Sequence, residues 1–158
     1  MSGAGSPTDG ISLDASGLTV TIVAGLWHTV ISDGLIAGAQ RALDRMGAKH
    51  DVIRCAGSFE LPLVCQAALN GGADAVVALG VIIRGGTPHF EFVSDAATSG
   101  LTRVALDTGK PVGFGVLTLD DEQQGIDRAG LPGSKEDKGE EAATAAVQAA
   151  LTIRALAG

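Results

Sequence analysis

The sequence predicts an open α/β sheet whose strands all run parallel, with helices covering both faces. Two observations carry this prediction. Apolar, β-branched runs alternate with segments of helical periodicity four times along the chain. The third run, Ala75–Ile83, has nine consecutive residues with neither a charge nor a hydroxyl, which is typical of a central strand buried on both faces. Such repeated strand–helix units with right-handed crossovers give a flavodoxin-like three-layer sandwich around a central four-stranded parallel sheet.

The first two units occupy the first half of the chain. Leu18–Val23 is β-branched and predicts a strand, and apolar residues then recur at helical spacing over Val30–Met46. His50–Ala56 predicts the second strand. The helix that follows, Leu61–Asn70, has Pro62 in its first turn, where the missing N–H costs no hydrogen bond.

The third unit contains the strand Asp74–Ile83, and its helix is predicted to begin near Pro88 and to run to about Asp107. Pro111–Thr118 supplies the fourth strand. A helix is then expected over Leu119–Ala129, with Thr118 as its cap.

A Gly- and Pro-containing loop, GLPGSKEDKG, follows this helix. Beyond the loop the sequence becomes rich in alanine, which has the highest helix propensity. The last helix is therefore predicted from about Glu140 to Leu156.

One domain with an N-terminal arm is expected. The 158 residues show no shift in composition that would divide them. Residues 1–13 are small, polar and interrupted by Gly and Pro, so we expect an arm ordered by a neighbouring subunit, and a single domain over residues 14–158. The apolar fraction is 46% but the aromatic fraction is only 3%, so Ala, Val, Leu and Ile must fill the core.

Charge and the length of the apolar runs argue against several classes of protein. A net charge of −7 disfavours a nucleic-acid-binding face and binding to an anionic membrane. No Lys or Arg precedes Arg41, so a secretory signal is not expected, and no apolar run approaches the ~20 residues that span a bilayer. We therefore expect a cytoplasmic protein. Cys55 and Cys65 match neither a CxxC pair nor a zinc spacing and are predicted to be buried free thiols.

Unusual residues gather at one predicted edge of the sheet. Ligands of open parallel sheets bind beyond the carboxyl ends of the strands, and those ends carry the sequences GLWH, GSFE, RGGTPH and GF. In RGGTPH, Gly85 and Gly86 let backbone N–H groups turn inward at a helix N-terminus, and the Thr87 hydroxyl adds a donor, which indicates a phosphate site. An ordinary turn that uses glycine for its geometry alone explains these residues equally well.

His89 is the candidate base at this edge. The dipole at a helix N-terminus disfavours imidazolium, so the ring is expected to be neutral and able to accept a proton, although a lone His is more often structural. His28 has no such setting. Two motifs are rejected: a nucleotide P-loop requires Lys where Gly86 stands, and the HxE of zinc deaminases, which His89 and Glu91 match, lacks its PCxxC. No metal is expected.

Aromatic residues are predicted to line a cleft at the same edge. Trp27 follows the first strand, and Phe59 and Phe114 are placed at the ends of the second and fourth strands, so a planar heterocycle would fit between them. Glu60 could accept hydrogen bonds from hydroxyls or ring N–H groups. Core packing for Trp27 and a simple helix-terminus role for Glu60 are the alternatives.

Arg128 and Lys138 flank the last loop, and each could reach an anion. Arg suits the fork of a phosphate, and Lys acts as a point charge. A solvated surface charge is the simpler explanation of either residue.

Four linked segments resemble one enzyme family. GSFELP, ALGVIIRGGTPHFEFV, GLTRVALDTGKPVGFGVLT and DRAGLPGSKEDKGEEAA are similar, in order and spacing, to motifs of the 6,7-dimethyl-8-ribityllumazine synthases of riboflavin biosynthesis. The resemblance implies a transferase that condenses 5-amino-6-(D-ribitylamino)uracil with 3,4-dihydroxy-2-butanone 4-phosphate. Imine formation, phosphate elimination and ring closure release phosphate and water, without a cofactor.

The resemblance also implies roles for individual residues. Those for ribitylaminouracil are Trp27, Ser58, Phe59, Glu60, Val81, Ile82, Ile83, Phe114 and Lys138. Those for the butanone phosphate are Gly85, Gly86, Thr87, His89 and Arg128. The implied catalytic residues are His89, as proton carrier, with Arg128 and Lys138. In this family Phe114, Arg128 and Lys138 come from the neighbouring subunit, so the complete site exists only in an oligomer.

The sequence departs from the family pattern at two places. Gly86 stands where a side chain is usual, and Trp27-His28 replaces the commoner Phe-Asn pair. The family forms pentamers, and some members pack twelve of them into a 60-subunit shell. The loop between Arg128 and Lys138 is longer than in the shell-forming pattern, so we expect a free pentamer. The resemblance further implies a functional link to riboflavin synthase.

Three alternative functions fit the sequence less well. A riboflavin synthase of the same fold, which dismutates two lumazines, would not need the phosphate loop with Arg128. A binding or shell protein without turnover would not need His89, Arg128 and Lys138 together. A flavodoxin-like electron carrier would need a Gly- and hydroxyl-rich loop after the first strand, where GLWHTV stands.

Overall fold

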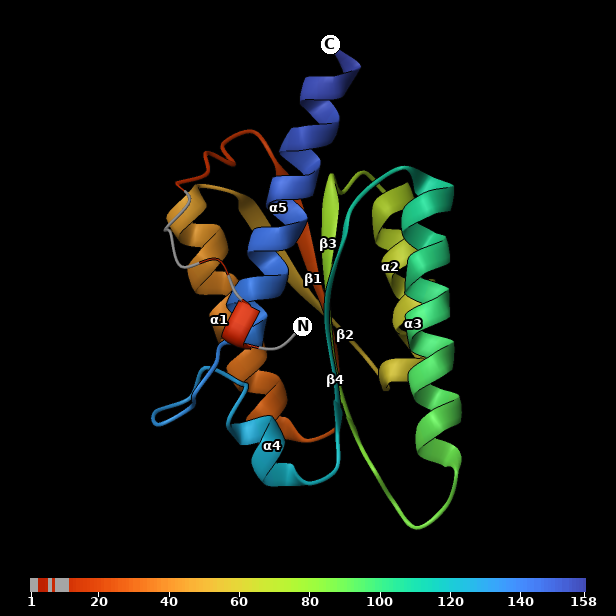
Figure 1. Ribbon diagram of the computed structural model, residues 1–158. Coiled ribbons are helices and arrows are strands. Elements are labelled where there is room, and N and C mark those ends of the chain that lie inside the picture. Colours follow the sequence, from red (N-terminus) through yellow and green to blue (C-terminus); the bar gives the residue numbers. More distant parts are fainter. Residues whose placement is uncertain (1–2, 6, 8–11) are drawn as a thin grey trace.

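The computed structural model describes residues 3–5, 7 and 12–158 of the chain. A four-stranded, all-parallel sheet in the order β2-β1-β3-β4 forms its centre, as predicted (Figure 1). The strands are β1 (Thr19–Gly25), β2 (Lys49–Cys55), β3 (Ala75–Ile83) and β4 (Val112–Leu119). Because β1 lies between β2 and β3, successive connections leave β1 in opposite directions, and the β1/β3 boundary is the topological switch point.

Helices cover both faces of the sheet, giving the expected three layers (Figure 1). One face carries α1 (Thr29–Met46), the short α4 (Glu122–Ile126) and α5 (Lys138–Ala157). The other face carries α2 (Leu61–Asn70) and α3 (His89–Thr108), and a short 3-10 helix, η2 (Ser58–Glu60), leads into α2. A further 3-10 turn, η1 (Gly3–Gly5), lies near the N-terminus. No helix among the described residues combines the length and the apolar character needed to cross a bilayer.

The central strand β3 divides the apolar core into two clusters. Val77 and Leu79 pack with α1 and α5, while Val76 and Ala78 pack with α2 and α3. Successive side chains of a strand point to opposite faces, so burial on both sides requires an unbroken apolar run. The uninterrupted apolar character of this segment is thus explained by its position in the middle layer.

The N-terminal part of the described chain joins the end of α1. Leu13 packs against the core between α1 and α5, and Ala15 N donates a hydrogen bond to Met46 O at 2.8 Å. Most of the expected arm, residues 1–13, lies outside the described residues.

Both cysteines are buried free thiols, as predicted. Burial, together with the nearby Cys55, raises the pKa of the Cys65 thiol to about 12. Burial also raises the pKa of Cys55, with a smaller contribution from Glu60. Since the thiolate is the reactive species, neither cysteine has the character of a nucleophile.

The helix predicted at Leu119–Ala129 is wrong in its limits. Thr118 and Leu119 do not cap a helix but continue β4, where they pair with Ile82 and Ile83 of β3. The actual cap of α4 is Asp121, whose carboxylate accepts a hydrogen bond from Gln124 N at 2.9 Å. Pairing with β3 therefore overrides the local capping signal of Thr118.

The close contacts of α1 with α5 and with the segment after α4 depend on glycine. A Cβ on Gly139, in the first turn of α5, would overlap the backbone carbonyl of Leu35 in α1. A Cβ on Gly34 of α1 would lie 2.7 Å from the carbonyl oxygen of Ala129. These contacts are to backbone atoms, which cannot move aside as a flexible side chain can.

We expect Gly139→Ala to lower the free energy of unfolding by about 1–3 kcal/mol, because overpacking forces the backbone of α5 away from α1. Thermal unfolding would measure the effect as a lower Tm. Gly86→Ala is the matched control, since a Cβ there would meet no atom within 4 Å and Tm should not change. Equal melting temperatures for Gly139→Ala and the unmodified protein would contradict the close approach.

Candidate active site

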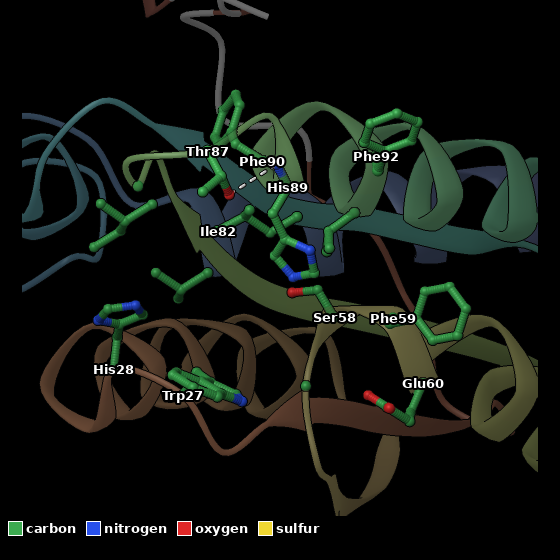
Figure 2. Close-up of a pocket in the computed structure, with 15 residues that line it drawn as sticks. Trp27, His28, Ser58, Phe59, Glu60, Ile82, Thr87, His89, Phe90 and Phe92 are labelled. Atoms are coloured by element: carbon green, nitrogen blue, oxygen red, sulfur yellow. Dashed lines mark hydrogen bonds between the residues drawn. The ribbon is translucent and has the colours of Figure 1, made fainter.

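A cavity of about 720 Å³ opens at the carboxyl edge of the sheet, beside the β1/β3 switch point (Figure 2). Its walls come from the segment after β1, from η2, from the end of β3 and from the first turn of α3. This volume lies in the range of sites that hold small molecules, about 300–1,000 Å³. The cavity thus occupies the place that the strand order assigns to a ligand.

Most residues singled out from the sequence line this cavity. They are Trp27, Ser58, Phe59, Glu60, Val81, Ile82, Ile83, Gly85, Thr87 and His89. Gly86 lies in an adjoining shallow hollow with Arg84 and Pro88. Sequence reasoning missed five lining residues, which are His28, Gly57, Phe90, Phe92 and Val93.

Trp27 is a surface of the cavity and not part of the core. Its side chain is 67% exposed, and a Cβ on Gly57 would lie 3.1 Å from Trp27 Cδ1, so the indole covers the glycine at the start of η2. His28 follows in the left-handed conformation with φ of 56°, and its ring centroid lies 6.3 Å from that of Trp27. His adopts this conformation more readily than β-branched residues do, and that tolerance is a weak sequence signal for the turn.

Two donors hold the end of β1 in place beneath this turn. Ser32 Oγ donates to the carbonyl oxygen of Gly25 at 3.0 Å, and Arg54 Nη2 donates to the same oxygen at 2.9 Å. Ser32 is buried, so its hydrogen bond is shielded from competing water. The backbone leading to Trp27 is therefore fixed from both α1 and β2.

The turn η2 brings a hydroxyl, an aromatic ring and a carboxylate to the cavity. Ser58 is buried against β3, where a Cβ on Gly80 would lie 2.5 Å from Ser58 Oγ, so only glycine leaves room for it. Phe59 is 64% exposed, and Glu60 is also exposed. Figure 2 shows the His89 ring directed from the start of α3 toward Ser58.

The loop between β3 and α3 is open to solvent and faces the N-terminus of a 20-residue helix. A Cβ on either Gly85 or Gly86 would meet no atom within 4 Å. The hydroxyl oxygen of Thr87 accepts a hydrogen bond from His89 N at 3.4 Å, so its own hydrogen remains available to a ligand. Helix dipole, open backbone and hydroxyl together suit an anion.

Arg84, at the base of this loop, is engaged by two carboxylates. Its Nη1 lies 2.5 Å from Glu91 Oε1 and its Nε lies 3.1 Å from Asp120 Oδ1. The hydrogen bond from Arg84 holds the pKa of Glu91 below its usual value, and the hydrogen bonds to Glu91 and Asp120 raise the pKa of Arg84. Glu91 is therefore ionised at neutral pH.

The two cations predicted for the site do not line the cavity of their own chain. Arg128 Nη1 donates to Gln124 O at 2.9 Å, and its Nε lies 3.5 Å from Glu136 Oε2. Lys138 Nζ lies 2.8 Å from Glu141 Oε2. Burial disfavours the Lys138 ammonium, but Glu141 and Glu136 outweigh this and raise its pKa. Both cations belong to the α4–α5 region, on the opposite face of the sheet from α3.

Phe114 is also absent from the cavity, and its expected position at the end of the fourth strand is wrong. It is the third residue of β4, pairs with Ala78, and precedes the end of the strand at Leu119 by five residues. Its ring is 51% exposed. The strand continues because the residues after Phe114 pack into both core clusters, Val116 on one face and Leu117 and Leu119 on the other.

Comparisons with known proteins point to one family. The sequence model of the 6,7-dimethyl-8-ribityllumazine synthase family matches residues 17–154, which include every strand of the sheet. A protein named 6,7-dimethyl-8-ribityllumazine synthase from Clavibacter sepedonicus is 70% identical over 159 residues, covering 100% of this chain and 99% of its own. Those of the same name from Leifsonia xyli subsp. xyli and Kocuria rhizophila are 68% and 62% identical, covering 100% and 97% of this chain, and 100% and 99% of their own.

The matched residues contain all the lining segments of the cavity. The similarity to these relatives extends over the whole length of the chain. The chain therefore belongs to the 6,7-dimethyl-8-ribityllumazine synthase family.

Proposed function

We propose that the chain condenses 5-amino-6-(D-ribitylamino)uracil with 3,4-dihydroxy-2-butanone 4-phosphate to 6,7-dimethyl-8-ribityllumazine. The observation that supports this most strongly is the pairing, in one cavity, of an aromatic wall at Trp27 with an anion-binding loop beside His89. A planar heterocycle needs an aromatic surface on which to stack, and a phosphorylated ketone needs an anion-binding loop. The names of the relatives give the same activity for their own chains.

Each substrate has its own side of the cavity in this proposal. The pyrimidine ring stacks on Trp27, and its ribityl hydroxyls bind near Ser58 and Glu60. Phe59 and the backbone of Val81–Ile83 complete this side. The phosphate of the ketone binds at Gly85, Gly86 and Thr87, at the positive end of α3.

His89 carries protons between the two substrates. The uracil amine attacks the ketone carbonyl to form an imine with loss of water, phosphate leaves, and the ribitylamino nitrogen closes the ring with loss of a second water. Each step moves a proton that a neutral imidazole can accept and return. Holding both reactants side by side removes most of the entropic cost of their encounter.

The site is completed by a neighbouring copy in a pentamer. Phe114, Arg128 and Lys138 do not line the cavity of their own chain, yet the phosphate requires a cation that the loop 85–88 lacks. Exposed apolar side chains on α2 and α3, Leu63 at 72% and Phe92 at 73%, give these helices a surface suited to a partner. We propose a free pentamer instead of a 60-subunit shell, acting in the cytoplasm and supplying riboflavin synthase. Buried free thiols suit that reducing compartment.

Mixing both substrates with the purified protein should produce the lumazine absorbance and release one phosphate for each lumazine formed. Omitting the ketone phosphate is the control for turnover of the uracil alone. A correctly assembled protein that binds the uracil but yields no lumazine would instead be a binding protein.

Replacement of His89 by Gln should lower kcat by about 10²-fold or more, because a general base typically contributes 10²–10⁴-fold. The Tm should not change, since the ring lies in an open cavity. His50→Gln is the control: His50 pairs with Asp44 at 2.7 Å, away from the cavity, and its loss should leave kcat unchanged. Equal kcat values for all three proteins would remove His89 from the mechanism.

Co-expression of a His89→Gln chain with an Arg128→Ala chain tests the shared site. Each variant alone should be nearly inactive. In random mixed rings, about a quarter of the cavities combine an intact His89 with an intact Arg128 from the next copy, so activity should return to about that fraction. If verified mixed oligomers showed no recovery of activity, His89 and Arg128 of different copies would not act in the same cavity, and the shared site would be wrong.

A further inference from the structure

We propose that Arg84 is a positioning residue that holds the two ends of the loop 85–88 together, and so fixes the anion site and His89 for the reaction. The name Arg84 cluster is used here for Arg84, Phe90, Glu91 and Asp120. The inference rests on the proposed function for the identity of the anion, but the geometry stands apart from it.

The Arg84 cluster joins the end of β3 to both the start of α3 and the end of β4. Arg84 N donates to Leu119 O at 2.8 Å, which extends the pairing of β3 with β4. Its Nη1 lies 2.5 Å from Glu91 Oε1, in the first turn of α3, and its Nε lies 3.1 Å from Asp120 Oδ1. The guanidinium carbon lies 4.3 Å from the centre of the Phe90 ring, a cation–π contact.

The loop itself makes few contacts that could position it. Gly85 and Gly86 have open space around them, and the Thr87–His89 hydrogen bond is long at 3.4 Å. Pro88 caps α3 without a side-chain hydrogen bond. Without side chains to pack, the glycines leave the backbone free to adopt many conformations. The link from Arg84 to Glu91 therefore restricts the loop at its ends.

Arg84 does not act as the counter-ion of the phosphate. Its single positive charge faces two carboxylates, Glu91 and Asp120, so the cluster carries a net negative charge. Asp120 is itself held, since its N donates to Gln124 Oε1 at 2.8 Å. A phosphate that approached Arg84 would displace a carboxylate and be repelled by it. The positive charge for the phosphate must come from elsewhere.

These ion pairs are too exposed to stabilise the whole fold. Arg84, Glu91 and Asp120 have side-chain exposures of 46%, 56% and 66%, and exposed pairs contribute about 0–1 kcal/mol. Their loss should consequently leave Tm almost unchanged while the loop moves. A displacement of about 1 Å at a reacting group can cost about 10²-fold in rate. Loss of these ion pairs should therefore be seen in the rate of the reaction and not in Tm.

The test compares Arg84→Gln, Glu91→Gln and the double variant. Each single change should lower kcat/KM for the ketone phosphate by about tenfold to a hundredfold, with little change in KM for ribitylaminouracil. The double variant should be no worse than Arg84→Gln, because both changes remove one interaction. Arg84→Lys should recover part of the loss.

Glu91→Gln separates positioning from direct phosphate binding. If Arg84 bound phosphate, removing its competing carboxylate would leave or improve kcat/KM for the ketone phosphate, and that result would overturn the proposal. Arg103→Gln is the matched control, because Arg103 forms an exposed pair with Asp107 at 3.1 Å on the same helix but outside the cavity. It should change neither kcat nor KM.

Hydrogen–deuterium exchange provides a readout that needs no turnover. Amides in residues 84–93 should exchange faster in Arg84→Gln and Glu91→Gln than in the unmodified protein, and those of α5 should not. If this occurs while the unmodified protein makes no lumazine, the proposed function fails and the positioning role survives. Unchanged exchange in an active enzyme would overturn the positioning role.

Discussion

Parallel pairing of β1 with β3 is the constraint on which the rest of the structure depends. It runs from Val20↔Ala75 to Ala24↔Leu79 and places the carboxyl ends of both strands at one edge, with the connections diverging to opposite faces. The space between those connections becomes the cavity. The residues that follow β1 and β3, Trp27 and the loop 85–88, meet there although about sixty positions separate them in the chain.

Among the described residues, no Lys or Arg of the same chain lines the cavity. Arg84 is paired with Glu91 and Asp120. Arg128 pairs with Glu136, just before α5, and Lys138 pairs with Glu141 in the first turn of α5. In the proposed function the loop 85–88 binds phosphate, which needs a cation, and a second copy supplies it. In that proposal, catalysis requires the assembly of several copies.

Local patterns in the sequence predicted most of the fold and one wall of the site. The apolar run of β3 has a single structural use, so it was informative, whereas the glycines of RGGTPH fit both a phosphate site and an ordinary turn. Where two local signals competed, tertiary pairing decided: Thr118 has the chemistry of a cap but continues β4. The Arg84–Asp120 contact joins residues 36 positions apart, and no local pattern indicates it. The left-handed turn at His28 was missed because the tolerance of His for this conformation is only a weak signal in the sequence.

A crystal structure of the assembled protein with inorganic phosphate would test the central claim, that the anion site is shared between copies, most directly. The account predicts phosphate within hydrogen-bonding distance of the backbone N–H groups of residues 85–87, with the Arg128 guanidinium of an adjacent copy on its other side. Phosphate bound at Arg84, or bound at the loop with Arg128 of every copy still on its own Glu136, would contradict it.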